Sequence, residues 1–496
     1  MKYLFYFYSC FNSTMMGGLV DEAIELAKNK DNEVLFAYCG GTNNMCIAIN
    51  PRGSSSLCAF CGKCTRRILK DYGISAVSLK EYVVDNRVSF NYKSASELRD
   101  ITYRGVNIGM SIISNYISMT RNQSPRIDDN SKPYFDAHLS QSVSTVDALY
   151  KLIDEYKPDK LYSFNGRFEE VRPIYDISQT LHLPCTMTEV IKKDGKWYKV
   201  SFHDHLPHDI KYNLERREYC WKHYKLTEEE KVALGESFYI KRRGGQDTGD
   251  LRIYVENQVE GNINCFKEDK RNIAIFNSSE DEFAAVGGDW DKLKLFKNQY
   301  EGIIYLLENA DPSIHFILRI HPNLEGIPYK YHTDLYNLPE RYQNVTVIPA
   351  SSNASTYTIM EKCEKVIAFW STMGIESSYW GKPVILLGPA MYCYDDVTYF
   401  PKSKEEALGL LTKDLAPKKN ENIIKYGAYL LNKDPLVVQT SIINCDTISH
   451  YFWGNKFTTT PFINFMGGEY LTGLYIAISR RIREKTSKFI IPTEEE

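Results

Sequence analysis

The sequence predicts an α/β protein with two mostly parallel sheets, and two stretches far apart in the chain carry this prediction. Residues 3–7 and 33–38 are short apolar runs, separated by a glycine-containing loop and a helical pattern over 19–30. Residues 366–369 and 384–387 repeat the arrangement around a second helical segment. Parallel strands need a crossover connection, usually a helix. Each stretch is therefore expected to be a strand–helix–strand unit of a Rossmann-like domain.

The composition excludes several classes of protein. The chain has 496 residues, 43% hydrophobic and 25% charged, which is typical of a soluble protein of two or three domains. A net charge of -3 gives no electrostatic reason to expect nucleic acid as a partner. No run reaches the ~20 apolar residues of a membrane span, and residues 1–7 are too short for a signal sequence. We expect a cytoplasmic protein whose twelve cysteines are reduced.

The first half of the chain offers candidates for acceptor binding. Gly17 and Gly18 do not form a dinucleotide fingerprint, so they are expected to allow close approach of an acceptor or to form a tight turn. A helix over 144–156 precedes a predicted strand over 160–164, which ends in Asn165 and Arg167. A helix over 169–181 and a strand over 186–190, with Glu189 near its end, follow. Polar residues on a loop between a strand and a helix are placed to bind ligand.

Five cysteines lie close together near the start of the chain. Cys58, Cys61 and Cys64 form a C-x2-C-x2-C pattern, with Cys46 and Cys39 upstream. Thiolates at this spacing suit a tetrahedral zinc site, for which Cys46, Cys58, Cys61 and Cys64 are the expected ligands and Cys39 a substitute. The alternative is a set of reduced, partly buried cysteines without metal.

The middle of the chain reads as a connection between domains. Four histidines between 203 and 223 lie among prolines and charges, without the helical spacing of a metal motif. Thr227 followed by three glutamates predicts a helix start. Residues 241–245, Lys-Arg-Arg-Gly-Gly, are expected to form a mobile basic loop that binds a phosphorylated ligand. The alternative is that this loop is only solvated.

The second half places polar residues after each predicted strand. Strands over 272–276, 314–320 and 366–369 end in Asn277-Ser278-Ser279, His321-Pro322 and Ser371-Thr372. The carboxyl ends of parallel strands are where ligands bind, and a helix start there attracts phosphate. Glu376, one turn further on, is expected to face the same pocket and accept hydrogen bonds from hydroxyls. The alternative is that Ser371 caps a helix and Glu376 is solvated.

Two further patterns in the second half have structural interpretations. Asp289-Trp290-Asp291 resembles a metal-nucleotide signal of another fold, but helix capping explains it better because a helical pattern over 292–307 follows. Residues 470–483 form a basic amphipathic pattern with Arg480, Arg481 and Arg483. This helix is expected either to touch a membrane surface or to pack back on the domains.

The predicted domains are an N-terminal Rossmann-like acceptor domain with a cysteine-rich insertion, a connection, a C-terminal Rossmann-like donor domain and a helical tail. Their boundaries are 1–225, 226–270, 271–430 and 431–496.

Several of these motifs resemble a known group. His321-Pro322, Ser371-Thr372-x-Gly374-x-Glu376 and the Gly-Lys-Pro-Val string at 381–384 are similar to the donor half of GT-B glycosyltransferases of the bacterial capsule and surface polysaccharide type. Residues 46–61 and 164–167 are similar to the N-terminal halves of the same group. The resemblance implies two domains facing across a cleft, a nucleotide-sugar donor in the C-terminal one, a glycan or lipid-linked acceptor, and no required catalytic metal.

The resemblance also implies roles for residues. The expected donor-binding residues are Ser278, Ser279, His321, Pro322, Ser371, Thr372, Gly374 and Glu376; the expected acceptor-binding residues are Gly17, Gly18, Asn165 and Arg167. His321 is expected to stabilise the leaving phosphate, and Glu189, Glu169 or Glu170 to be the catalytic base.

The expected activity is inverting glycosyl transfer. Two alternatives are a nucleotide-sugar 2-epimerase of the same architecture and a noncatalytic, zinc-stabilised glycan-binding or assembly protein.

Overall fold

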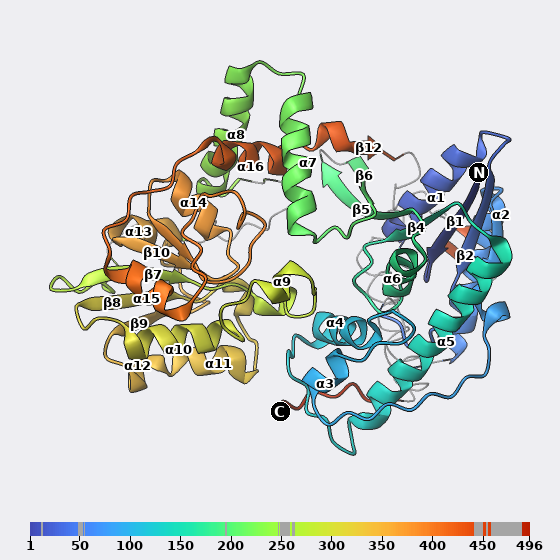
Figure 1. The fold of residues 1–496 in the computed structure, drawn as a ribbon, viewed down its shortest axis with the longest axis horizontal. Coiled ribbons are helices and arrows are strands. Elements are labelled where there is room, and N and C mark those ends of the chain that lie inside the picture. Colours follow the sequence, from blue (N-terminus) through green and yellow to red (C-terminus); the bar gives the residue numbers. More distant parts are fainter. Residues whose placement is uncertain are drawn as a thin grey trace. The chain divides into compact units, whose positions relative to one another are not determined.

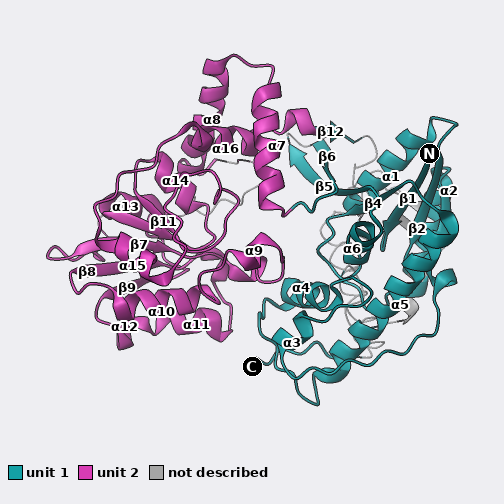
Figure 2. Ribbon diagram, in the orientation of Figure 1, with its two compact units in different colours: residues 1–207, 437–496 teal, residues 208–436 magenta. Residues whose placement is uncertain are grey.

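The computed structural model describes residues 1–10, 13–47, 53, 55–193, 196–246, 248, 258–259, 263–440, 450–452, 455–457 and 489–496. The chain forms two compact units (Figure 2). Unit 1 contains residues 1–207 and 437–496, and unit 2 contains residues 208–436. The end of the chain thus joins unit 1, where the Arg126 amide donates to the Glu494 carbonyl over 2.9 Å.

Unit 1 is built on a seven-stranded sheet in the order β12-β6-β5-β4-β1-β2-β3 (Figure 1). Its strands are β1 Lys2–Phe7, β2 Glu33–Tyr38, β3 Ser75–Ser78, β4 Lys160–Phe164, β5 Cys185–Lys193, β6 Lys196–His203 and β12 Val437–Gln439. The pairs from β5 through β3 are parallel, whereas β6 and β12 add antiparallel strands at one edge. The buried runs of Leu, Phe and Tyr in β1 and β4 are typical of parallel strands covered on both faces.

The helices of unit 1 are α1 Ser13–Ala27, α2 Ser55–Asp71, α3 Ala95–Arg99, α4 Ile108–Thr120, α5 Lys132–Tyr156 and α6 Arg172–Leu181. The predicted turn at Gly17 and Gly18 is wrong, because α1 already begins at Ser13 and both glycines are buried inside it. Packing of this apolar helix overrides the low helix propensity of glycine.

Unit 2 is built on a five-stranded, fully parallel sheet in the order β11-β10-β7-β8-β9. Its strands are β7 Arg271–Phe276, β8 Ile314–Arg319, β9 Val345–Ile348, β10 Lys365–Ala368 and β11 Val384–Leu386. The chain runs from β7 to β9 on one side and returns to β10 on the other. Ligands bind at such a switch point, beyond the carboxyl ends of the strands.

The helices of unit 2 are α7 Ile210–His223, α8 Glu228–Arg243, α9 Asp289–Lys292, α10 Gln299–Asn309, α11 Lys330–Tyr336, α12 Leu338–Arg341, α13 Thr356–Lys362, α14 Met373–Tyr379, α15 Lys404–Thr412 and α16 Glu421–Leu431. Thr227 caps α8 at the predicted helix start, in a capping box with Glu230. The basic stretch expected as a mobile loop is instead the last turn of α8, which extends to Arg243.

The predicted α/β class with two Rossmann-like units is confirmed, and each unit has its own core of aromatic and branched aliphatic residues. The predicted basic helix over 470–483 lies outside the described residues. The described parts of the tail include a hairpin of β13 His450–Phe452 and β14 Asn455–Phe457. Among the described residues, no helix combines the length and apolarity needed to cross a bilayer.

Candidate phosphate-binding pocket

A small pocket lies in unit 2 at the switch point of the sheet. It is lined by His321 and Pro322 after β8, by Ser371 and Thr372 after β10, and by Glu376 of α14. The structure therefore brings together five of the eight predicted donor-binding residues. The pocket volume is about 60 Å³. A space of this size holds a few water molecules, which is the footprint of a phosphate group rather than of a whole nucleotide sugar.

One wall of the pocket is a buried ionic layer. The Glu376 carboxylate is fully buried and accepts from Arg242 Nε over 3.1 Å and from the Tyr357 hydroxyl over 2.5 Å. Burial opposes the charge of Arg242, but Glu376 more than offsets this, so the net shift of the Arg242 pKa is upward. Glu376 thus faces the pocket as expected, but each carboxylate oxygen already accepts a protein hydrogen bond.

Arg319, the last residue of β8, adds a cation that no described carboxylate pairs with. Its side chain is buried and donates to the backbone carbonyls of Ile320, Pro349 and Ser352. Burial lowers its pKa to about 10, so the guanidinium stays protonated at neutral pH. No ion pair joins Arg319 to a carboxylate within the described ranges, and its Nε has no acceptor there.

Two more pocket residues present donors. The Asn277 Oδ1 accepts from the His321 amide over 2.8 Å, which leaves its Nδ2 buried with no partner among the described residues. Arg242 Nη1 is likewise buried with no partner among the described residues. His321 Nδ1 accepts from the Asn323 amide over 3.1 Å, so the neutral ring carries its proton on Nε2. Asn277, Arg242 and Arg319 thus line the same small pocket, and each has a buried N–H group without a partner among the described residues.

Ser278 and Ser279 shape the loop after β7 without lining the pocket. Gln299 of α10 fixes this loop: its Oε1 accepts from the Ser278 amide over 3.1 Å and its Nε2 donates to the Ser278 carbonyl over 2.9 Å. Glu280 accepts from the Gln299 amide over 3.2 Å, and burial raises the pKa of Glu280 to about 7. The Ser279 hydroxyl donates to Asp281.

The Ser371 loop depends on close packing beneath it. Ser371 Oγ accepts from the Met373 amide over 3.3 Å, but the N-cap residue of α14 is Thr372, whose side chain makes no capping hydrogen bond. The Tyr392 hydroxyl donates to the Ser371 carbonyl. Gly374 lies against this hydroxyl, where a Cβ atom would overlap it. Gly374 is thus a packing residue of the pocket.

The expected bases Glu169 and Glu170 lie in a buried network of unit 1. Glu169 is 1% exposed and accepts from Gln141 and Ser142, and it pairs with His138 Nδ1 over 2.6 Å. Glu170 accepts from Asn115. Burial, followed by the charge of Glu169, raises the pKa of Glu170 to about 7. Both carboxylates are enclosed by protein donors.

The other unit 1 candidates surround the end of β4. Asn165 Nδ2 donates to Glu189 Oε1 over 2.5 Å, and Asn165 Oδ1 accepts from the Arg167 amide over 2.9 Å. Arg167 Nε donates to Ser114 Oγ over 2.7 Å. The structure thus brings Asn165, Arg167 and Glu189 together, and Glu189 is the half-buried carboxylate of the three expected bases.

The expected zinc ligands are all described and buried, together with Cys39. Among the described residues, no group of three potential metal ligands is gathered in the arrangement that the structure shows. Cys61 and Cys64 interact with Cys10, which lowers the pKa of Cys61 to about 6. Burial raises the pKa of Cys39 to about 12. Zinc binding by these cysteines stays a prediction.

Sequence reasoning placed Asn277 at a strand end without a donor-binding role, missed Arg319 and Gln299, and assigned Arg242 to a loop. Arg319 was visible as a cation at the end of an otherwise apolar strand pattern. A buried charge there requires either a partner or a ligand. Gln299 had no local signal, because its role comes from the packing of α10 beside the β7 loop.

Residues 263–416, which span most of unit 2, match a family model described as capsule polysaccharide biosynthesis protein. This segment carries the capsule-biosynthesis signature. The predicted resemblance to a capsule-type protein is therefore confirmed over these residues, which include all eight expected donor-binding positions. No functionally curated protein matches the sequence.

Several solved structures are similar at low identity. They include the β-Kdo 2,7 transferase KpsC of Thermosulfurimonas dismutans, at 14% identity, with 62% of this chain and 85% of that chain covered and a TM-score of 0.33. The UDP-GlcNAc 2-epimerase of Neisseria meningitidis is 14% identical, with coverages of 88% and 95% and a TM-score of 0.21. The spinosyn rhamnosyltransferase SpnG with thymidine diphosphate is 11% identical, with coverages of 88% and 97% and a TM-score of 0.21.

Proposed function

We propose that this protein is a glycosyltransferase of capsule or surface polysaccharide synthesis, and that the unit 2 pocket binds the phosphate of a nucleotide-sugar donor. The observation that carries the proposal is that Asn277, Arg242 and Arg319 line one pocket and each has a buried N–H group with no partner among the described residues, in a unit with the capsule-biosynthesis signature. Buried donors without acceptors are costly, and a phosphate oxygen supplies the missing acceptor.

The charge of the pocket favours an anion. Glu376 balances Arg242, whereas Arg319 has no carboxylate partner among the described residues. The pocket lining therefore keeps one uncompensated positive charge. Arginine is well suited to phosphate because its guanidinium stays charged and offers several N–H groups in a fixed plane. A leaving phosphate gains charge during glycosyl transfer, so the same guanidinium stabilises the transition state more than the ground state.

The residues suggest a division of roles in an inverting reaction. The acceptor hydroxyl attacks the anomeric carbon, the bond from that carbon to the phosphate oxygen breaks, and the nucleotide leaves. The neutral ring of His321 carries its proton on Nε2 and donates a hydrogen bond from there to the leaving phosphate. Glu189, held by Asn165, takes the acceptor proton. Arg319 and Arg242 supply the positive charge, so the proposal includes no catalytic metal.

We place the reaction in the cytoplasm, with a surface glycan or a lipid-linked saccharide as the acceptor. Such an acceptor has the hydroxyl that the reaction requires and connects glycosyl transfer to the capsule-biosynthesis signature of unit 2.

Isothermal titration of the full chain with nucleoside mono- and diphosphates tests the donor pocket. Asn277→Asp keeps the acceptor for the His321 amide but replaces the free N–H by a carboxylate oxygen. We expect tenfold weaker binding or more, since a hydrogen bond to a charged group contributes about 1.5–3 kcal/mol. Asn309→Asp, on the exposed end of α10, is the matched control. Nucleotide binding that Asn277→Asp leaves unchanged would refute the pocket assignment.

Product analysis tests the reaction. Incubation with nucleotide sugars should release nucleotide, and His321→Ala should lower turnover more than nucleotide affinity. Formation of an epimerised nucleotide sugar without any acceptor would instead identify the 2-epimerase. Binding without any turnover of donor, with or without glycan acceptor, would leave a noncatalytic glycan-binding protein.

A further inference from the structure

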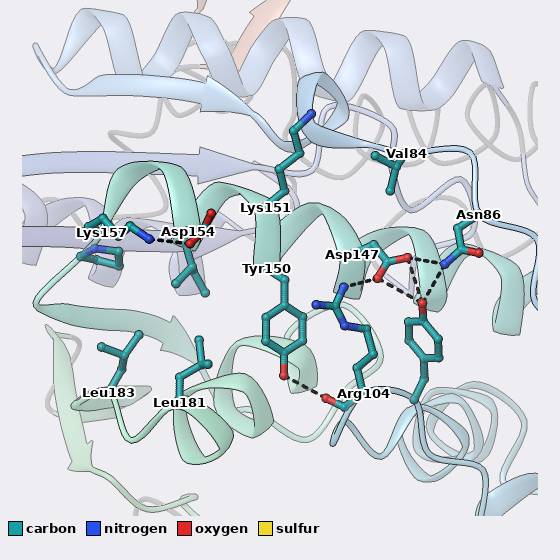
Figure 3. A pocket seen from close by; sticks show the side chains of 13 residues that line it. Val84, Asn86, Arg104, Asp147, Tyr150, Lys151, Asp154, Lys157, Leu181 and Leu183 are labelled. Atoms are coloured by element: carbon teal, nitrogen blue, oxygen red, sulfur yellow. Dashed lines mark hydrogen bonds and ion pairs between the residues drawn. The ribbon is translucent and has the colours of Figure 1, made fainter.

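Unit 1 contains a second pocket that shares no residue with the phosphate pocket (Figure 3). It lies along the C-terminal half of α5 and is closed by residues 84–86, by the turn at 103–104 and by residues 181–183 after α6. Its volume is about 840 Å³. Pockets of roughly 300–1,000 Å³ are the usual size for organic ligands.

A buried carboxylate organises the polar end of this pocket. The Asp147 side chain is 4% exposed and accepts from Arg104 Nη1 over 2.6 Å, from the Tyr103 hydroxyl over 3.0 Å and from Asn86 Nδ2 over 2.9 Å. A buried carboxylate with three donors is fully compensated. Asp147 therefore acts as an anchor that fixes the orientation of Arg104.

Arg104 is held on a second side by Tyr150. Its guanidinium carbon lies 4.1 Å from the centre of the Tyr150 ring, and the Tyr150 hydroxyl donates to the Arg104 carbonyl over 2.9 Å. Figure 3 shows the guanidinium between Tyr150 and Asp147. Even so, the Arg104 side chain is 47% exposed, and its Nε and Nη2 donate to no described residue. A fixed guanidinium edge of this kind binds a carboxylate or phosphate with little loss of side-chain entropy.

The remaining charges leave the lining positive. Asp154 pairs with Lys157 over 2.5 Å, and Asp147 pairs with Arg104. Lys151, exposed on α5, makes no hydrogen bond or ion pair with any residue in the described ranges. Three cations and two anions therefore line the pocket, a net charge of one positive unit. The charge complement of this lining is a ligand with one negative group.

Part of the pocket lining is apolar. Leu181 and Leu183 lie side by side (Figure 3), Ile153 and Pro158 also line the pocket, and Val84 lies apart from them, beside Asn86; Leu181 and Val84 are both 41% exposed. Exposed aliphatic side chains beside a fixed guanidinium match a ligand that has a charged group on one edge and a C–H face on the other. A sugar ring bearing a carboxylate has this combination.

We propose that this pocket binds an acidic saccharide, with its carboxylate on Arg104 and near Lys151 and its ring against Leu181 and Leu183. The proposal uses the proposed function only to choose a saccharide among organic anions. Capsule synthesis would bring a glycan to unit 1, and this pocket would then select a glycan with a carboxylate-bearing residue.

Titration calorimetry of the full chain with trigalacturonate, and with neutral maltotriose for comparison, tests the proposal. Trigalacturonate should bind at least about tenfold more tightly than maltotriose, and Lys151→Gln should weaken it severalfold. Arg104→Gln should weaken it about tenfold or more. Arg87→Gln removes an equal charge from an exposed side chain outside the pocket lining and should have no effect.

Three results would overturn the proposal: no trigalacturonate binding to the unmodified chain, equal binding of maltotriose, or unchanged binding in Lys151→Gln. Arg104→Gln can unfold the protein, because it leaves the buried Asp147 carboxylate without its cation. Lys151→Gln does not carry this risk, because Lys151 pairs with no buried group among the described residues, so the lysine variant still tests the proposal. Inorganic phosphate that competes with trigalacturonate at equal concentration would show a general anion site and overturn the saccharide assignment. Asn277→Asp should retain trigalacturonate binding, so failure of the donor pocket is distinguishable from failure of this one.

Discussion

Gly374→Ala tests whether close packing under the Ser371 loop builds the phosphate pocket. A Cβ atom at Gly374 would overlap the Tyr392 hydroxyl oxygen and lie 3.1 Å from both Ala368 Cβ and Tyr392 Cζ. Tyr392 is 1% exposed and its hydroxyl donates to the Ser371 carbonyl. The ring therefore cannot move aside without breaking this hydrogen bond or disturbing the core.

The magnitude follows from three contributions. Overpacking costs about 1–3 kcal/mol, and loss of the Tyr392 hydrogen bond costs about 0.5–1.5 kcal/mol. Alanine stabilises a helix by about 0.5–1 kcal/mol relative to glycine, which partly offsets these costs. The net destabilisation of unit 2 is then about 0.5–4 kcal/mol, with a central value of about 2 kcal/mol. Since about 1 kcal/mol shifts the midpoint of a unit of this size by about 2–4 °C, calorimetry should show a fall of several degrees.

A double-mutant cycle separates the clash from other effects. Tyr392→Phe alone should destabilise unit 2 through the lost hydrogen bond, but Gly374→Ala should cost less in its presence because the nearest clashing atom is gone. Gly409→Ala, in α15, has open space around the new Cβ and should be neutral or stabilising. Strict additivity of the first two substitutions would show that the clash does not control the site.

Three further outcomes follow from buried groups of unit 2. Glu376→Ala should lower stability by about 3–5 kcal/mol in denaturant titration, because it leaves the Arg242 guanidinium buried without its carboxylate. The pKa of Glu280 is raised to about 7 by burial, so its protonated form favours folding and this stability is lost as pH rises from about 4.5 through 7. Glu280→Gln should remove this loss, up to about 3 kcal/mol at pH 8, as seen by comparing melts at pH 5 and pH 8. Gly427→Ala should destabilise the contact of α16 with α8 in a calorimetric melt, since its Cβ would overlap the Gly235 carbonyl and lie 3.0 Å from Tyr239.

The central strands could be predicted from the sequence because their signal is local. The patterns over 33–38 and 160–164 coincide with β2 and β4, and the pattern over 272–276 lacks only the first residue of β7. Parallel strands buried on both faces appear as continuous apolar runs. Because the carboxyl ends of parallel strands lie at one edge of the sheet, the strand ends alone predicted that His321 and Ser371 lie at the same edge.

Features that depend on contacts between distant segments could not be predicted in this way. The edge strand β12 pairs with β6 more than two hundred residues earlier, and three residues carry little pattern of their own. Gly17 and Gly18 suggested a turn because glycine usually interrupts helices, but burial of α1 decided otherwise. Arg242 was predicted to lie in a basic loop, but its side chain is held by a hydrogen bond to Glu376 of α14, a contact between segments far apart in the sequence.

The chemistry of the pocket depends on the same distinction. Polar residues after β7, β8 and β10 predict where a ligand binds, but not which charge the ligand carries. That charge depends on how the ionic groups pair: Glu376 is satisfied by Arg242 and Tyr357, whereas Arg319 has only backbone carbonyls within the described ranges. If Glu376 paired with Arg319 instead, Arg242 would become the uncompensated cation and the net charge would stay the same. The preference for an anion therefore follows from the number of charges enclosed, and the pairing decides which N–H groups are left to bind it.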